Sequence, residues 1–120
     1  MPAVWDPAAA LERVAGDKAL LVELIAIFFE DYPRYHAALQ QSLEQGDLAA
    51  LQKAAHTLKG SLSYLGAKEG ASLALKIEQA ALESNAASAR ELIPQFTAYI
   101  DSIKPLMMSL SEEPDDAGNH

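Results

Sequence analysis

The stretch AAHTLKGSLSYLG, residues 54–66, places a histidine, a lysine and a glycine at helical spacing. Lys59 follows His56 by three residues and Gly60 follows it by four, so all three share one side of an α-helix. Neutral imidazole predominates near pH 7 and is a good nucleophile. A phosphoryl group on that ring needs a nearby cation, which Lys59 supplies, and space, which Gly60 leaves. The three residues therefore indicate a phosphoryl-acceptor site.

A helical projection separates this site from the apolar side of its segment. At about 100° per residue, the leucines fall away from His56, which we therefore expect to be exposed. Polar or small residues project on the same side as the histidine: Gln52, Lys53, Lys59, Gly60 and Ser63. Residues 48–68 contain three lysines and no Asp or Glu, although the formal net charge is -8. This pattern predicts a locally basic, acid-free face, and a chance gap among solvated surface charges is the alternative.

Other chemistries lack their residues in this sequence. There is no cysteine, which excludes a disulfide framework, a thiolate metal site and a thiol nucleophile. The metal-site spacings HxxxH and HExxH, the hydrolase motif GxSxG and the nucleotide loops GxxxxGK[ST] and GxGxxG do not occur. We therefore expect no bound metal and no cofactor in this chain. Any phosphate must then be delivered by another protein.

Composition limits the class of protein. A chain of 120 residues, half of them hydrophobic and only 7% aromatic, is typical of one helical domain. The net charge of -8 argues against a nucleic-acid surface. Neither a signal peptide nor an uncharged stretch of membrane-spanning length is visible, so we expect a cytoplasmic protein with no membrane contact.

Apolar periodicity and the capping residues Asp6, Asp17 and Asp47 predict five helices and no strand. These helices cover approximately residues 7–14, 18–45, 48–66, 68–84 and 87–110. Pro33 lies inside the second helix, where we expect a kink or a break. The prediction is an all-α domain at residues 1–110, formed by an antiparallel four-helix bundle with an additional short N-terminal helix. The acidic residues 111–120 are predicted to be a disordered tail.

The central motif also resembles a known family. The run Ala55–Ser61, followed by Gly66, resembles the signature of the histidine phosphotransfer (HPt) domain of two-component phosphorelays. The segment LERVAGDKALLVELIAIFFEDYP resembles the family's first helices, and Gly46–Asp47 resembles its entry into the histidine helix. Residues 75–78 resemble the segment where the next helix returns. The resemblance covers about residues 6–106.

This resemblance implies how the domain works and with which partners. His56 would accept a phosphoryl group from a receiver-domain aspartate or a kinase and pass it to the aspartate of a response regulator. Lys59 would steady the group and Gly60 would make space for it. The implied partners are receiver domains, which bring their own magnesium, and an upstream sensor histidine kinase. We expect a monomer without kinase or hydrolase activity of its own.

Glu78 departs from the family pattern, because some members carry a glutamine at this position, 22 residues after the histidine. A glutamate on a helix surface is ordinarily solvated. Alternatively, Glu78 accepts a hydrogen bond from the inner nitrogen of the His56 ring and raises the basicity of the outer one. His36 is expected to be a surface residue of the second helix.

A second function remains open besides phosphotransfer. The apolar run of the second helix should place Phe28 and Phe29 in the core, and any exposed remainder of that run could dock a receiver domain. The alternative is therefore a non-phosphorylated helical adaptor that binds and occludes a receiver or kinase domain. Such an adaptor has no chemical reason to keep His56 together with Lys59 and Gly60.

Overall fold

The computed structural model describes residues 5–112, and within this range every regular element is a helix. The elements are α1 (Pro7–Arg13), α2 (Lys18–Gln45), α3 (Leu48–Tyr64), α4 (Lys68–Leu82), α5 (Ala86–Met108) and the 3₁₀ helix η1 (Ser109–Glu112). The all-α prediction is confirmed. Residues 111 and 112, which were assigned to the tail, belong to η1, and the rest of the predicted tail lies outside the described residues.

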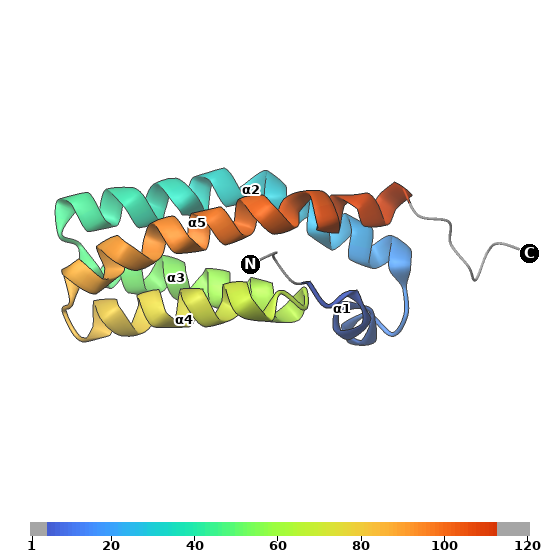
Figure 1. Ribbon diagram of the computed structural model, residues 1–120, viewed down its shortest axis with the longest axis horizontal. Helices are drawn as coiled ribbons and strands as arrows, with labels where there is room; N and C mark the ends of the chain where they lie inside the picture. Colours follow the sequence, from blue (N-terminus) through green and yellow to red (C-terminus); the bar gives the residue numbers. More distant parts are fainter. Residues whose placement is uncertain (1–4, 113–120) are drawn as a thin grey trace, which may run out of the picture.

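The four long helices lie lengthwise beside one another, and α1 lies across one end (Figure 1). Each long helix contacts two others: α3 packs between α2 and α4, and α5 packs between α4 and α2. At the end of the bundle where α1 lies, the two helices α2 and α5 extend past the ends of α3 and α4. Contacts of α2 with α1 and with η1 occupy this overhang.

Short polar side chains fix most of the helix starts. Before α1, α2, α3 and α5, one side chain accepts a hydrogen bond of 3.1 Å from the backbone N–H three residues later; these are Asp6, Asp17, Asp47 and Asn85. Such caps satisfy N–H groups that have no partner inside the helix. The three aspartate caps are confirmed predictions. The cap by Asn85 was not foreseen, and α5 begins one residue earlier than predicted.

Between α3 and α4, the chain turns at Gly66. This residue has φ of +75°, a left-handed conformation that favours glycine. A Cβ added there would lie 2.5 Å from the backbone oxygen of Asp6 and 3.2 Å from the backbone nitrogen of Ala10. The turn therefore lets the start of α1 approach the end of α3, where Trp5 Nε1 donates to the carbonyl of Leu65 at 2.7 Å.

Of the kink or break predicted at Pro33, the break does not occur, because α2 continues through it from Lys18 to Gln45. A proline inside a helix removes one backbone hydrogen bond and disturbs the preceding turn. Pro33 itself is exposed, whereas Phe29 and Leu39, on either side of it, are buried in the core. Apolar packing on both sides of the proline thus holds α2 as one element.

One apolar core runs through the four long helices. The fully buried large side chains are Phe96, Leu21, Ile25, Leu39, Leu51, Leu58, Leu62, Ile77, Ile100, Ile103 and Met107. Phe28 and Phe29 are also buried, which confirms their predicted place in the core. Burial of such side chains contributes about 1.5–3 kcal/mol each, before the loss of conformational entropy.

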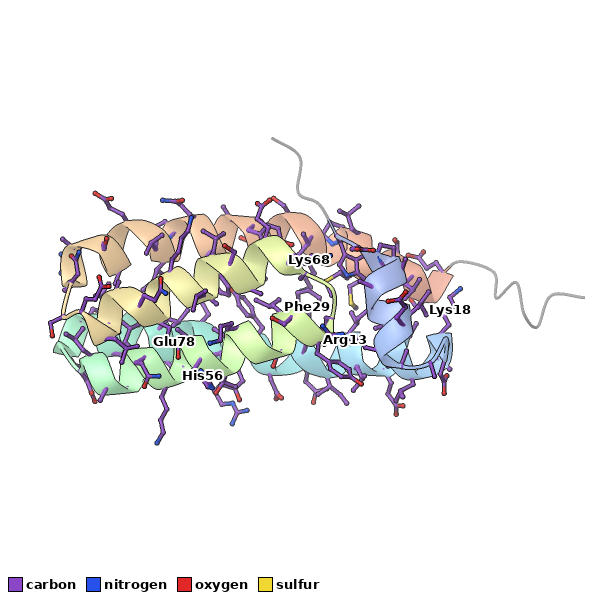
Figure 2. The ribbon with its side chains drawn as sticks, turned by 90° about the horizontal axis from the view of Figure 1, so that it is seen from below. Arg13, Lys18, Phe29, His56, Lys68 and Glu78 are labelled. Carbon is purple, nitrogen blue, oxygen red and sulfur yellow. The ribbon has the colours of Figure 1, made fainter. Side chains whose placement is uncertain are left out.

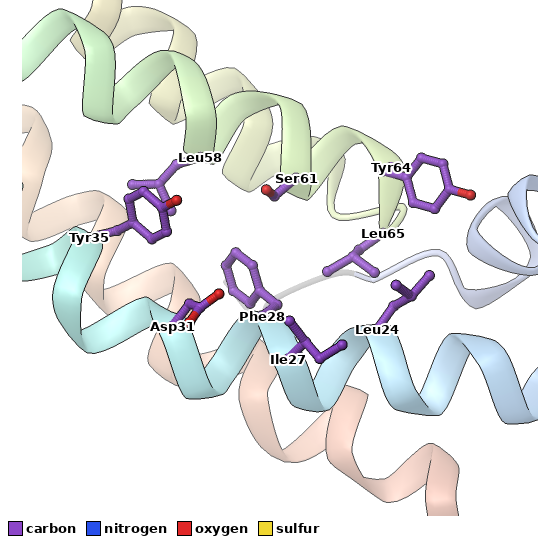
Figure 3. Close-up of a pocket in the computed structure, with 9 residues that line it drawn as sticks. All are labelled: Leu24, Ile27, Phe28, Asp31, Tyr35, Leu58, Ser61, Tyr64 and Leu65. Atoms are coloured by element: carbon purple, nitrogen blue, oxygen red, sulfur yellow. The ribbon is translucent and has the colours of Figure 1, made fainter.

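A groove of about 260 Å³ remains open between α2 and α3 (Figure 3). Its lining is mainly apolar and consists of Leu24, Ile27, Phe28, Tyr35, Leu58, Tyr64 and Leu65, together with Asp31 and Ser61. Ile27 is 50% exposed at its edge. The apolar run of α2 therefore does leave a remainder at the surface, as the sequence suggested.

Replacement of Gly70 by alanine should destabilise the fold. An added Cβ would lie 2.6 Å from a ring carbon of Tyr99 and 3.2 Å from a methyl group of Leu62, and both side chains are buried. We expect Gly70→Ala to lower the free energy of unfolding by about 1–3 kcal/mol in urea titrations, because neither neighbour has room to move.

Gly60→Ala is the matched control, since it makes the same change inside a helix where the added Cβ meets nothing within 4 Å. That variant should gain up to ~1 kcal/mol from helix propensity alone. Equal effects of the two substitutions would contradict this account of the packing.

Candidate functional site

His56 lies on the outer side of α3. The opposite side of this helix is buried through Leu51, Ala55, Leu58 and Leu62. The His56 side chain is 62% exposed, so its predicted orientation is confirmed (Figure 2). An exposed imidazole is accessible to a reacting group brought by another molecule.

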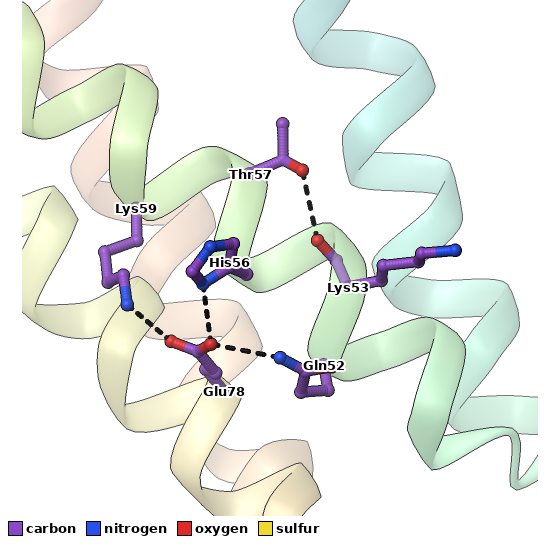
Figure 4. Close-up of polar contacts among 6 residues, drawn as sticks. All are labelled: Gln52, Lys53, His56, Thr57, Lys59 and Glu78. Carbon is purple, nitrogen blue, oxygen red and sulfur yellow. Dashed lines mark hydrogen bonds and ion pairs between the residues drawn. The ribbon is translucent and has the colours of Figure 1, made fainter.

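The neighbour of the His56 ring is a buried carboxylate from the next helix. Glu78, on α4, is only 6% exposed. Its Oε2 accepts hydrogen bonds from His56 Nδ1 at 2.8 Å and from Gln52 Nε2 at 3.1 Å, and its Oε1 accepts one from Lys59 Nζ at 2.8 Å (Figure 4). The ordinary interpretation of Glu78 as a solvated surface residue is therefore wrong. The contact with the inner ring nitrogen is the alternative that the structure confirms.

The sequence did carry a signal for this burial. Ala74, Ile77 and Ala81 stand four residues before, one before and three after Glu78, and all three are buried. Residues at these spacings share one face of a helix, so Glu78 interrupts the apolar face of α4. A charged residue on a buried face needs partners, and those partners come from α3.

The hydrogen bonds keep Glu78 ionised. The bond from the Lys59 ammonium is the largest cause that lowers the Glu78 pKa, from its ordinary 4.5 to about 2; those from Gln52 and His56 act in the same direction, and burial opposes them. An ionised carboxylate can only accept hydrogen bonds. Nδ1 of His56 must therefore carry a proton, which leaves Nε2 as the unprotonated nitrogen of the neutral ring.

The prediction of an acid-free face is wrong, because α4 brings Glu78 into it. The Lys59 side chain is 29% exposed and forms an ion pair with this carboxylate. The segment of residues 48–68 contains no acidic residue, but its counter-charge comes from 19 residues further along the chain. Lys59 therefore neutralises Glu78 before any phosphoryl group arrives.

The other predicted site residues lie at different distances from this cluster. Gln52 belongs to it through Glu78. The side chain of Lys53 is exposed and points away from Glu78, and its backbone oxygen accepts a hydrogen bond from the Thr57 hydroxyl (Figure 4). Ser63 is exposed two turns further along α3, and within residues 5–112 no hydrogen bond joins it to the cluster. Gly60 faces open space, so no neighbour within this structure requires a glycine there.

His36 differs from its prediction as a surface residue. It is half-buried, and its Nε2 lies 3.1 Å from the Thr97 hydroxyl oxygen, which joins α2 to α5. Beside it, burial is the main cause that raises the pKa of Tyr32 to about 12. These residues stabilise the packing of α2 on α5.

The described part of the chain has neither a metal-binding cluster nor a membrane-spanning helix. Residues 5–112 contain no cluster of three or more His, Asp or Glu side chains that could hold a metal ion. None of the helices within that range combines the length and apolar character that crossing a bilayer requires.

Acid should remove a part of the stability that depends on Glu78. The folded protein binds a proton at Glu78 only near pH 2, whereas the unfolded chain binds it near 4.5. The contribution of the ionised Glu78 to the free energy of unfolding is therefore complete above about pH 4.5 and is lost as the pH falls toward 2. Glu78→Gln should flatten the dependence of the free energy of unfolding on pH in this window. Glu83→Gln, an exposed change at the end of α4, should leave the dependence as steep as in the wild type.

Glu78 should also fix the tautomer of His56. In the wild type above pH 8, ¹⁵N chemical shifts of the ring should show a protonated Nδ1 and an unprotonated Nε2, because the carboxylate accepts only from an N–H. In Glu78→Gln the side-chain amide can donate as well as accept, so the two tautomers should mix. An unchanged ratio would show that Glu78 does not select the tautomer.

Comparison with known families agrees with this site. The family model described as Hpt domain matches residues 23–105, a range that starts in α2 and ends in α5 and includes His56 and Glu78. Comparisons with curated proteins and with solved structures gave no match. The family match confirms the resemblance seen in the sequence. The chain therefore belongs to the Hpt domain family, and this membership implies a phosphotransfer role in two-component phosphorelays.

Proposed function

We propose that this protein is a phosphoryl carrier that uses His56. The ring accepts a phosphoryl group from the aspartyl phosphate of a receiver domain, or from a sensor histidine kinase, and passes it to a response-regulator aspartate. The observation that carries the proposal is the hydrogen bond of 2.8 Å between His56 Nδ1 and the ionised Glu78. With Nδ1 holding the proton, the free electron pair is on Nε2, the outer nitrogen of an exposed ring.

The transfer needs no group that the two proteins do not supply. The Nε2 electron pair attacks the phosphorus atom, an N–P bond forms, and the P–O bond to the aspartate breaks and restores the receiver's carboxylate. Nδ1 keeps its proton, so the ring becomes positively charged, and the Glu78 carboxylate at 2.8 Å offsets this charge. In the onward step a second aspartate attacks the phosphorus, and the imidazole leaves as a neutral ring.

Lys59 and Gly60 complete this site. The Lys59 ammonium is held by Glu78, one helical turn from His56, and its flexible stem allows it to reach an oxygen of a phosphoryl group on Nε2. Gly60 leaves the next turn of α3 without a side chain. In support of an external role for this glycine, nothing within the described structure fills the space that a Cβ would occupy.

The receiver domain supplies what the carrier lacks, namely the acidic pocket and its magnesium ion. We propose that it docks over His56 and uses the apolar groove between α2 and α3 as part of its footprint. Leu58, Ser61 and Tyr64 line this groove from the same helix that carries the histidine (Figure 3). An exposed apolar patch beside a reacting group marks a surface on which a partner protein can dock.

We further infer that the carrier is a monomer and that α2–α5 form the antiparallel four-helix bundle expected from the resemblance, with α1 as the additional helix. In support, consecutive long helices are joined by short turns, and each contacts two of the others.

Phosphate transfer should depend on His56 and on no other histidine in the described structure. Incubated with a phosphorylated receiver domain, the wild type should acquire acid-labile, base-stable phosphate, and His56→Gln should acquire none while remaining folded. His56→Gln removes one of the three hydrogen bonds to the buried Glu78, so it should lower the free energy of unfolding by about 1 kcal/mol, which leaves the bundle folded in thermal unfolding. The matched control is His36→Gln, which removes a half-buried histidine remote from Glu78 and should still accept phosphate.

Gly60→Ala tests the space beside the ring in the same assay. Since the added methyl group should stabilise α3, slower transfer by roughly tenfold would reflect crowding of the reacting group and not a damaged fold. If the wild type binds the receiver without transfer, and His56→Gln binds equally well, the adaptor becomes the better account of the protein.

A further inference from the structure

A second cleft lies on the other side of α3, between this helix, α1 and α4. Its volume is about 350 Å³, and Lys59 forms part of its wall. Arg13 lines it from the last turn of α1 and Lys68 from the first turn of α4, and Ser63 and Ser72 also line it. Lys59 also binds Glu78, so the cleft shares this residue with the site of His56.

The cleft is basic in a strongly acidic protein. Three of the nine Lys and Arg residues of the chain line it, although the formal net charge is -8. Within residues 5–112, none of the side chains that line it is acidic. Because Glu78 already neutralises Lys59, Arg13 and Lys68 supply the charge that attracts acidic groups into this concave surface.

Two of these cations are available to a partner. The Lys68 side chain is 76% exposed, and its ion pair with Asp6 is long, at 3.6 Å. Exposed pairs of this kind are weak and exchange easily with other anions. The Arg13 guanidinium lies 5.9 Å from the centre of the Tyr64 ring and forms no ion pair within the described residues. Figure 2 shows Arg13 and Lys68 between α1 and His56 along the length of the molecule.

We propose that this cleft receives an acidic surface segment of the receiver domain that exchanges phosphate with His56. The inference rests on the proposed function, because it is His56 that brings a receiver to this face. Carboxylates of the partner pair with Arg13 and Lys68 while its phosphorylated aspartate lies over the imidazole. Elsewhere the carrier's net negative charge repels an acidic partner, so the cleft orients the encounter as well as attracting it.

The cleft and the apolar groove have separate effects on binding. The groove, on the side of α2, buries apolar surface and contributes mainly to affinity. The basic cleft, on the side of α1 and α4, acts through charge and should contribute mainly to the association rate and to the choice of partner. Together they lie on either side of the exposed strip of α3 that carries the histidine.

A charge-reversal experiment tests the cleft. The receiver domain that transfers phosphate fastest to the wild type is used with the double variant Arg13→Glu and Lys68→Glu. Lys76→Glu with Arg90→Glu is the control, since it makes the same change in net charge at exposed positions outside the cleft. Phosphorylation by phosphoramidate, a small donor that needs no docking, is measured in parallel. Thermal unfolding of both variants confirms that they are folded.

The cleft variant should lose about tenfold or more in the second-order rate of transfer at low salt, and this difference should shrink as the salt concentration rises. The control should change by less than about twofold, and both variants should react with phosphoramidate as the wild type does. Equal losses in the two variants, or no loss in either, would overturn the cleft as the docking site. If the wild type accepts phosphate from neither donor, the proposed function itself fails.

Discussion

The ionised carboxylate of Glu78, enclosed between α3 and α4, is the interaction on which the rest of the site depends. A buried carboxylate is stable only when its oxygens are hydrogen-bonded and its charge is compensated. Gln52, His56 and Lys59 meet both requirements from three positions on α3. The same hydrogen bonds that hold these two helices in register also determine which ring nitrogen faces solvent.

Close packing of α4 makes this arrangement possible. The side of α4 that faces the other helices is formed largely by small buried residues, namely Gly70, Ala71, Ala74, Ala80 and Ala81. Small side chains at a contact bring helix axes closer together. The short distance between α3 and α4 allows the Glu78 carboxylate to reach three donors on α3. The small buried residues of α4 take no part in the chemistry, but their packing positions Glu78 and thereby the His56 ring.

The two sides of α3 provide different kinds of surface. Toward α2, the groove at Ile27 and Tyr64 is apolar, and toward α1 and α4 the cleft at Arg13 and Lys68 is basic. His56 lies on the exposed strip of α3, and Gly60 leaves the adjacent turn open. A partner that approaches the histidine therefore meets one surface that binds apolar side chains and another that attracts acidic ones. The two surfaces together select partners more strictly than either surface alone.

The sequence alone determined the features that arise within a few residues of the chain. The aspartate caps act on N–H groups three residues away, and the 3.6-residue period already directs His56 outward. The run Ala55–Ser61 likewise indicated the family without any structure.

Only the tertiary structure decided which side chains from different helices meet. Glu78 is 22 residues from His56, and neither its contact with the imidazole nor its ion pair with Lys59 follows from local spacing. The continuity of α2 through Pro33 was decided in the same way. Local helix signals do not include the stabilisation that α2 gains by packing its apolar side chains in the core. Contacts between helices depend on how closely all the helices pack, and that distance is a property of the whole core.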